Sequence, residues 1–173
     1  YKRHANIADV VEAINESPKP VILAVKQNFP EHIKKINGLL GGNMMTAFKA
    51  AGCVGVLTDG PSRDVDEIRP FGIQYMLTGV TPGHGAFALQ ATNVPVNICG
   101  MGVQPLEIIH MDENGAVKFP REYLEEVVIR AKRVVAKEAK MQDALRRTGG
   151  DLEKIKMVFN GIYEFDEKKD TGR

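Results

Sequence analysis

Tryptophan is absent from this sequence of 173 residues, and aromatic residues make up only 6% of it. Few side chains are therefore available for base stacking, which argues against a surface for single-stranded nucleic acid. Basic and acidic residues nearly balance, 23 against 22, so the formal net charge is only +1. A charge this small does not attract nucleic acid or an anionic membrane. We therefore expect neither partner.

Long apolar runs and cysteines are also scarce. No run approaches the roughly 20 residues of a membrane helix, and no secretory signal is visible. The two cysteines, Cys53 and Cys99, each stand in an apolar, strand-like context, which predicts buried free thiols. Free thiols are typical of a reducing cytoplasm, where we expect the protein. No histidine lies near either cysteine in sequence to act as a base, which disfavours a catalytic thiol.

The remaining composition is that of an ordinary globular protein, with 43% hydrophobic and 26% charged residues. We expect one domain over residues 1–160 and a charged tail over 161–173. The sequence opens on Tyr1 rather than Met, and we expect further residues upstream. Helical and strand patterns mix, with hairpin-like strands in the second half. This mixture favours a compact α/β sandwich with antiparallel strands over a doubly wound parallel sheet.

Hydrophobic periodicity and turn residues predict where the elements lie. Helices are expected over residues 7–16, 42–51 and 65–69, along a long stretch from Pro120 to Gly149, and after Asp151, which suits an N-cap. The apolar stripe from Leu124 to Leu145 indicates packing in the core or between subunits. Strands are expected over residues 21–25, 54–57, 73–77, 94–99, 107–111 and 115–119, the last two forming a hairpin with Asn114-Gly115 in its turn.

One stretch places several groups suited to a site along the same rim. Gly41-Gly42 opens a helix whose free N–H groups and positive dipole end could face an anion. The strand after that helix delivers Arg63 and Asp64 at its carboxyl end, where sites of α/β proteins often lie. Two plainer interpretations stay open: the glycines simply begin a helix, and Arg63 and Asp64 form a loop salt bridge. Asp59 is more typical of a side chain that fixes the Gly60-Pro61 turn.

These residues resemble the signature of a known family. Ala47, Gly52, Gly55, Asp59-Gly60 and Arg63-Asp64, at this spacing, resemble the RraA-like family. That family includes the regulator of ribonuclease activity A and the class II 4-hydroxy-4-methyl-2-oxoglutarate / 4-carboxy-4-hydroxy-2-oxoadipate aldolases. Further similar pieces follow in the family's order: Gly79-Val80-Thr81-Pro82, Asn93-Val94-Pro95-Val96, Asp112 and Gly115. The resemblance implies a swivelling β/β/α-type sandwich with a mixed sheet, assembled as a homo-trimer or a hexamer.

The resemblance also implies a site and a reaction. Backbone amides of Gly42, Asn43, Met44 and Met45 would hold the carboxylate of a small 2-oxo acid. Arg63 would polarise the keto oxygen, and Asp64 would hold Mg²⁺ or Mn²⁺. The implied activity is that of a metal-dependent lyase, an aldolase or oxaloacetate decarboxylase with a pyruvate enolate intermediate. A cation beside the enolate oxygen stabilises the transition state more than the ground state.

The sequence departs from the family pattern at two places. Metal-dependent members carry an acid where this sequence has Gly42, and Glu67 matches a downstream acidic position that could compensate as a second metal-binding acid. Pro105-Leu106-Glu107 stands where a Pro-Gly-Asp turn is usual, a change expected to affect the fold more than the site. Two other functions therefore stay open: a protein-binding regulator of a ribonuclease, and a family member without the lyase activity.

Overall fold

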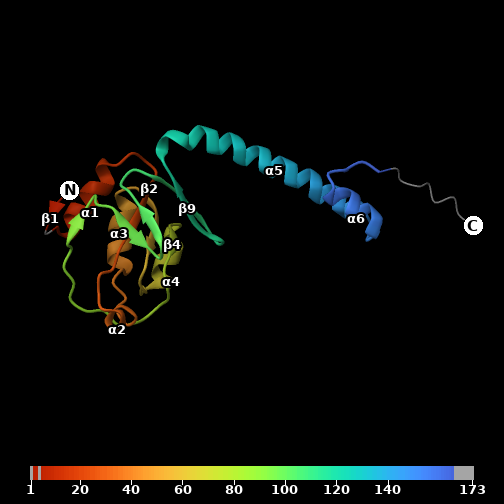
Figure 1. The fold of residues 1–173 in the computed structure, drawn as a ribbon. Helices are drawn as coiled ribbons and strands as arrows, with labels where there is room; N and C mark the ends of the chain where they lie inside the picture. The colour runs from red at the N-terminus through yellow and green to blue at the C-terminus, as the bar shows by residue number, and fades with distance from the viewer. Residues whose placement is uncertain (1, 4, 166–173) are drawn as a thin grey trace, which may run out of the picture. The chain divides into compact units, whose positions relative to one another are not determined.

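The computed structural model describes residues 2–3 and 5–165 and shows a mixed α/β fold, as predicted (Figure 1). Contacts along the chain separate two compact units, residues 1–121 and 122–173, and each is described by itself. The expected domain over residues 1–160 stays a prediction. Of the expected charged tail, residues 166–173 lie outside the described residues.

The first unit contains most of the elements that the sequence predicted, at nearly the predicted bounds. Its helices and strands are β1 (Lys2–Arg3), α1 (Ile7–Glu16), β2 (Val21–Val25), α2 (Glu31–Lys34), α3 (Gly42–Ala50), β3 (Cys53–Thr58), α4 (Val65–Ile68), η1 (Arg69–Phe71), β4 (Gln74–Met76), β5 (Ala91–Thr92), β6 (Val96–Ile98), β7 (Met101–Val103), β8 (Ile108–Asp112) and β9 (Gly115–Phe119). A 3₁₀ turn, η2 (Arg121–Tyr123), spans the boundary to the second unit.

A parallel sheet in the order β2-β3-β4 carries the core of this unit, with β3 in the centre. Strand β3 is an apolar run of the kind that buries both faces, and Val56 in its middle is fully buried. Helices α1 and α3 place their apolar faces against this core. Its buried side chains are Val10, Ile14, Leu40, Met45, Phe48, Cys53, Val56 and Ile68. The end of the central strand is therefore held rigidly, and the candidate site lies just beyond it.

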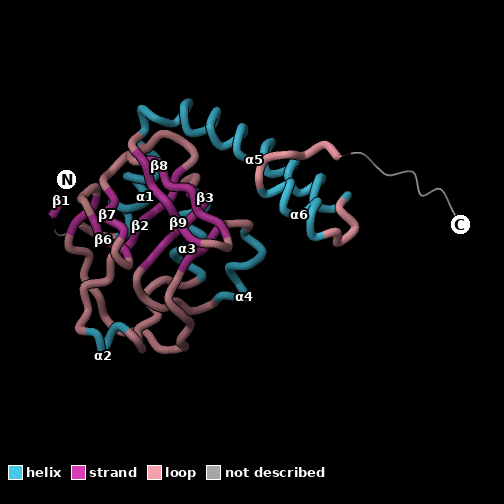
Figure 2. The backbone as a smooth tube through the Cα atoms, turned by 45° about the vertical axis from the view of Figure 1, so that its right-hand side comes forward, coloured by secondary structure: helices cyan, strands magenta, loops and turns pink. Residues whose placement is uncertain are grey.

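The other strands form three antiparallel pairs, β1-β5, β6-β7 and β8-β9. Strands β8 and β9 can be followed side by side in Figure 2. The sequence did not predict the hairpin β6-β7, whose turn residues Cys99 and Gly100 have φ of +50° and +93°. This backbone is typical of a tight two-residue hairpin turn. Cys99 is consequently exposed, and the prediction of a buried thiol there is wrong. Cys53 is buried, as predicted.

The turn within the hairpin β8-β9 and the turn before it differ in detail from expectation. Asp112 pairs with Gly115, so the loop residues are Glu113 and Asn114 and Gly115 already belongs to β9. In the turn before β8, Leu106 has φ of +69°, and its neighbour Glu107 accepts a hydrogen bond from the Gln104 amide at 2.8 Å. A positive φ at the third residue of a turn favours glycine, so Leu106 occupies the position where the resemblance leads us to expect the glycine of a Pro-Gly-Asp turn.

The second unit consists of α5 (Leu124–Arg147) and α6 (Leu152–Phe159), joined by the left-handed residues Gly149 and Gly150. Asp151 caps α6 by accepting from two backbone amides, as predicted. Ala144 is buried, whereas Leu124, Val128, Val134 and Val135 of the expected stripe are exposed. The stripe is therefore not core packing within this unit. Among the described residues, no helix is long and apolar enough to span a membrane.

Candidate functional site

Three backbone segments run side by side beyond the carboxyl ends of β3 and β4. The Arg63 amide donates to the Leu40 carbonyl at 3.2 Å, and the Ser62 amide donates to the Gly79 carbonyl at 3.0 Å. The Thr81 amide in turn donates to the Ser62 carbonyl at 2.9 Å. These bonds extend the parallel pairing past the named strands. They bring the Gly41-Gly42 turn next to Arg63 and Asp64, which the sequence placed on one rim.

The first turn of α3 takes its cap from Asp64. Gly41 is the N-cap residue and has no side chain to offer, while the Asp64 carboxylate accepts from the Gly42 amide at 2.9 Å. Met45 already uses its amide in the helix, donating to the Gly41 carbonyl at 3.0 Å. Of the four predicted carboxylate-binding amides, those of Asn43 and Met44 have no protein acceptor recorded among the described residues. No recorded protein acceptor therefore competes with a ligand for these two amides.

The two glycines leave room for charged side chains. A Cβ on Gly41 would lie 2.5 Å from Asp64 Oδ2 and 2.8 Å from Arg63 Cζ. A Cβ on Gly42 would lie 2.5 Å from Glu67 Oε2. Neither glycine has a positive φ, so close approach rather than backbone conformation requires them. The Glu67 carboxylate thus lies next to Gly42, the position where the family resemblance leads us to expect an acid.

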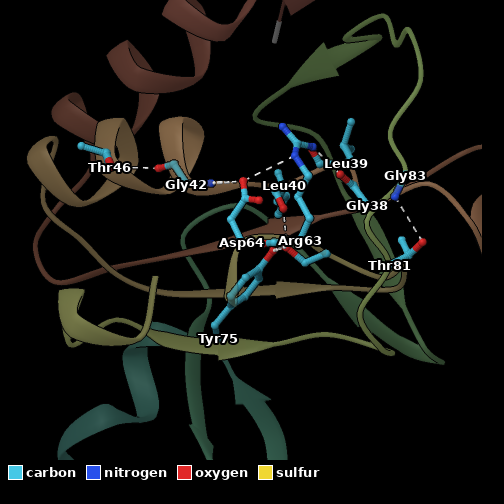
Figure 3. Close-up of polar contacts among 11 residues, drawn as sticks. Gly38, Leu39, Leu40, Gly42, Thr46, Arg63, Asp64, Tyr75, Thr81 and Gly83 are labelled. Carbon is cyan, nitrogen blue, oxygen red and sulfur yellow. Dashed lines mark hydrogen bonds and ion pairs between the residues drawn. The ribbon is translucent and has the colours of Figure 1, made fainter. Parts of the chain in front are cut away.

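The Arg63 side chain is held by the backbone that leads into α3 (Figure 3). Its Nη1 donates to the carbonyls of Gly38 and Leu39, and its Nε lies 3.4 Å from Asp64 Oδ2. The side chain of Arg63 is 24% exposed and that of Asp64 35% exposed. The predicted loop salt bridge therefore exists, and both groups still face solvent beside the free amides. Nη2 of Arg63 has no protein partner recorded in the part of the chain that the structure describes.

Asp59 has a different role from the one expected. Its Oδ2 pairs with Lys26 and, at 2.6 Å, with Lys34, and its Oδ1 accepts from the Gln27 amide at 2.8 Å. Asp59 thus ties the segment after β2 to the end of β3 instead of fixing the Gly60-Pro61 turn. Burial alone would raise the pKa of Asp59, but these hydrogen bonds outweigh it and hold the pKa below its usual value.

Sequence reasoning also missed the contacts behind the turn. Tyr75 of β4 donates to the hydroxyl of Ser62, and Ser62 donates to the Leu40 carbonyl. Burial raises the pKa of Tyr75 to about 12 despite the opposing hydrogen bond to Ser62. A tyrosine in the middle of a predicted strand is an ordinary core residue, so no local signal marked these contacts.

The carboxylates present fit a hard divalent cation that keeps most of its water. The carboxylates of Asp64 and Glu67 both lie close to the Gly42 backbone, and both residues are exposed. Among the described residues, no cluster of three or more histidines, cysteines, aspartates and glutamates could hold a metal. Mg²⁺ is commonly bound through one or two carboxylates and several waters, which matches this donor set. Whether the predicted site residues bind these ligands stays a prediction.

Comparison with known proteins gives consistent matches. A family model described as RraA-like (Aldolase/RraA) matches residues 2–118. An uncharacterized protein of Methanocaldococcus jannaschii, MJ0644, is 35% identical over 116 residues, which cover 66% of this chain and 55% of that relative. The chain thus spans little more than half the length of this curated relative.

Two solved structures show the same fold. One is RraAS2 of Streptomyces coelicolor, described as an unusual member of the RNase ES inhibitor RraA protein family. It is 28% identical and has a TM-score of 0.61 over 75% of this chain and 65% of that chain. The other is an uncharacterized protein of Pseudomonas syringae pv. tomato. It is 26% identical and has a TM-score of 0.66 over 83% of this chain and 70% of that chain.

Proposed function

The chain belongs to the RraA-like (Aldolase/RraA) family, and on that premise we propose that it is a divalent-metal-dependent lyase acting on a small 2-oxo acid. The observation that supports this proposal most is the convergence of three groups at one helix start. These are the Arg63 guanidinium, the Asp64 carboxylate and the first-turn amides of α3. Together they place a guanidinium, a carboxylate that can bind a metal and a set of anion-binding amides next to the first turn of α3.

The first-turn amides recognise the substrate carboxylate. Asn43 and Met44 present N–H groups at the positive end of the α3 dipole, where an anion is stabilised. Asn43 is exposed and Met44 partly buried, so a ligand can reach this turn from solvent.

Arg63 stabilises the charge that develops in the reaction. When the carbon–carbon bond beyond the keto group breaks, the departing fragment leaves as CO₂, or as a carbonyl compound whose hydroxyl proton passes to solvent. The electron pair of the broken bond moves through the α-carbon to the keto oxygen and forms an enolate. Since Nη1 and Nε are engaged by the turn and by Asp64, Nη2 is the nitrogen available to donate to that oxygen. The guanidinium is fixed before the reaction, so it needs no reorganisation as charge develops. Protonation of the enolate carbon then gives pyruvate.

Asp64 and Glu67 are the residues that would hold Mg²⁺ or Mn²⁺. When bound, such an ion supplies Lewis-acid stabilisation of the enolate charge. Glu67 reaches the Gly42 backbone from helix α4, so this chain provides the second acid from α4 rather than from position 42. A homo-trimer or hexamer, which the family resemblance implies, stays a prediction.

The test is pyruvate release from 4-hydroxy-4-methyl-2-oxoglutarate or oxaloacetate, with and without Mg²⁺. We expect turnover that depends on the metal and falls about 10²-fold or more in Arg63→Ala, the usual effect of losing one transition-state donor. Arg69→Ala is the matched control, because Arg69 is exposed and follows on the same segment. Turnover no greater than that in buffer, or equal in wild type and Arg63→Ala, would contradict the proposal.

A second function is supported by the likeness to RraAS2, whose description names ribonuclease inhibition. On this alternative the chain binds a ribonuclease and lowers its activity. The measurement is ribonuclease turnover with increasing amounts of the purified chain. Inhibition that persists in Arg63→Ala would separate this activity from the lyase site, whereas unchanged ribonuclease turnover at saturating concentration would exclude it.

A further inference from the structure

The carbonyl of Leu40 lies at the last peptide before the N-cap of α3. It accepts two hydrogen bonds, one from the Ser62 hydroxyl and one from the Arg63 amide at 3.2 Å. Leu40 is 3% exposed and Ser62 is fully buried, so water does not compete for these bonds. The direction of this carbonyl is therefore fixed by groups on the loop after β3.

Tyr75 determines how the Ser62 hydroxyl is used. A serine hydroxyl has one proton, and when Ser62 gives it to the Leu40 carbonyl it can only accept from Tyr75. The competing acceptor, the Arg63 carbonyl, is 3.4 Å from Ser62 Oγ. Since the pKa of Tyr75 is about 12, Tyr75 keeps its proton at physiological pH and remains the donor. The hydrogen bonds thus run in one direction, from Tyr75 to Ser62 to Leu40.

The direction of the Leu40 carbonyl sets the direction of the next amide. Among the described residues, only Lys19-Pro20 has a cis peptide bond, so the bond between Leu40 and Gly41 is trans. In a planar trans peptide the C=O and the following N–H point to opposite sides. A carbonyl held toward Ser62 therefore turns the Gly41 N–H away from Ser62. The same constraint fixes the start of α3 beneath Arg63 and Asp64, whose side chains lie against Gly41.

We propose that Tyr75 and Ser62 are positioning residues for the ligand-binding turn. They hold the Leu40-Gly41 peptide so that the amides at the start of α3 point to the carboxylate of the 2-oxo acid. This inference rests on the proposed function for its ligand, although the orientation of the peptide does not depend on it. Tyr75 has no direct role in the reaction and acts only through Ser62.

The experiment compares Tyr75→Phe, Ser62→Ala and the double variant, with Tyr123→Phe as control because Tyr123 is exposed. Oxalate serves as the probe, and its affinity in the presence of Mg²⁺ is measured by calorimetry beside the melting temperature. We expect Tyr75→Phe to bind oxalate about five- to tenfold more weakly, the effect of one lost hydrogen bond. Because the residues act in series, the double variant should match Ser62→Ala. KM for the 2-oxo acid should rise more than kcat falls.

Two results would overturn the inference: Tyr75→Phe with wild-type oxalate affinity, or effects of the two substitutions that add. A loss of melting temperature alone, with oxalate affinity unchanged, would assign these residues a structural role only. If wild type itself fails to bind oxalate, the proposed function fails, and the amide resonances of the ligand-free protein decide about the positioning. Tyr75→Phe should then shift the Gly41 and Gly42 resonances more than Tyr123→Phe does, and unshifted resonances would overturn it.

Discussion

Asp59 and Asp64 follow the same strand, β3, yet their surroundings differ. The Asp59 side chain is 4% exposed, and both of its oxygens accept hydrogen bonds, from Lys26, Lys34 and the Gln27 amide. The Asp64 side chain is 35% exposed, and its recorded contacts, with the Gly42 amide and Arg63, all involve Oδ2. One carboxylate is saturated by the protein, while the other keeps an oxygen for a ligand.

The difference shows how one sequence element can separate structural and functional acids. A buried carboxylate must be neutralised by close partners, because desolvation is costly otherwise. Asp59 meets that demand and fixes the segment that leads to Gly38, whose carbonyl holds Arg63. Asp64 is exposed enough to need only partial compensation, so it remains available.

Asp59→Asn should destabilise the fold by about 3 kcal/mol. The substitution removes the charge that two lysines share and leaves them beside a neutral amide, and breaking a buried ion pair typically costs about 3–5 kcal/mol. Urea unfolding measures the loss, with Asp66→Asn as control because Asp66 is an exposed acid nearby. A loss below about 0.5 kcal/mol, the range of ordinary surface changes, would remove the distinction between the two aspartates.

Asp64→Asn should have the opposite profile. Asn tolerates the left-handed backbone at this position, φ +59°, and its side-chain oxygen can still accept from the Gly42 amide. We expect stability within about 1 kcal/mol of wild type but kcat/KM lower by about 10²-fold. Unfolding and lyase kinetics on the same preparation test both parts. Wild-type kinetics in this variant would contradict the metal-binding role.

Gly42→Ala should weaken Mn²⁺ binding without destabilising the helix. The new Cβ would lie 2.5 Å from Glu67 Oε2, so the Glu67 carboxylate must move away. Alanine is also the better helix former, by about 1 kcal/mol, so the melting temperature should not fall. We expect about tenfold weaker Mn²⁺ affinity by calorimetry. Glu67→Gln should give a similar loss, and tight binding in both variants would exclude Glu67 from the site.

The two lysines on Asp59 should contribute unequally. Lys34 has a side chain that is 13% exposed, against 35% for Lys26, so its charge is less screened by solvent. Lys34→Met should cost about 1 kcal/mol of unfolding free energy, and Lys26→Met clearly less. Urea unfolding of both variants gives the comparison. Equal losses would show that burial does not distinguish the two ion pairs.

The smallest expected effect is on the pH dependence of stability in acidic solution. Because hydrogen bonds from the two lysines and the Gln27 amide hold the pKa of Asp59 below its ordinary value in the folded protein, its ionised form stabilises the fold. This contribution is complete above about pH 4, the unfolded pKa, and is lost as pH falls through the folded pKa. Acid unfolding followed by circular dichroism should be less steep in Asp59→Asn than in wild type. Identical pH dependence in the two proteins would contradict the lowered pKa.

Local sequence patterns predicted most elements of the fold and the position of the candidate site. Helix α1 and strand β2 have the predicted bounds, because a 3.6-residue period and an apolar run depend only on neighbouring residues. The Gly41-Gly42 turn and the Arg63-Asp64 pair lie together as predicted, since both adjoin the central strand. Cys99 was mispredicted, because the residues around it look strand-like and only pairing with β7 makes it a turn.

The sequence by itself determined the secondary-structure elements. It also determined that two glycines, an arginine and an aspartate lie beyond the carboxyl end of β3. Tertiary structure alone decided which aspartate is saturated and which stays open, because their partners come from distant parts of the chain. Lys34 and Lys26 reach Asp59 across 25 and 33 residues, and the Gly42 amide reaches Asp64 across 22. Burial and charge pairing over such separations follow from packing, and no local pattern of residues encodes them.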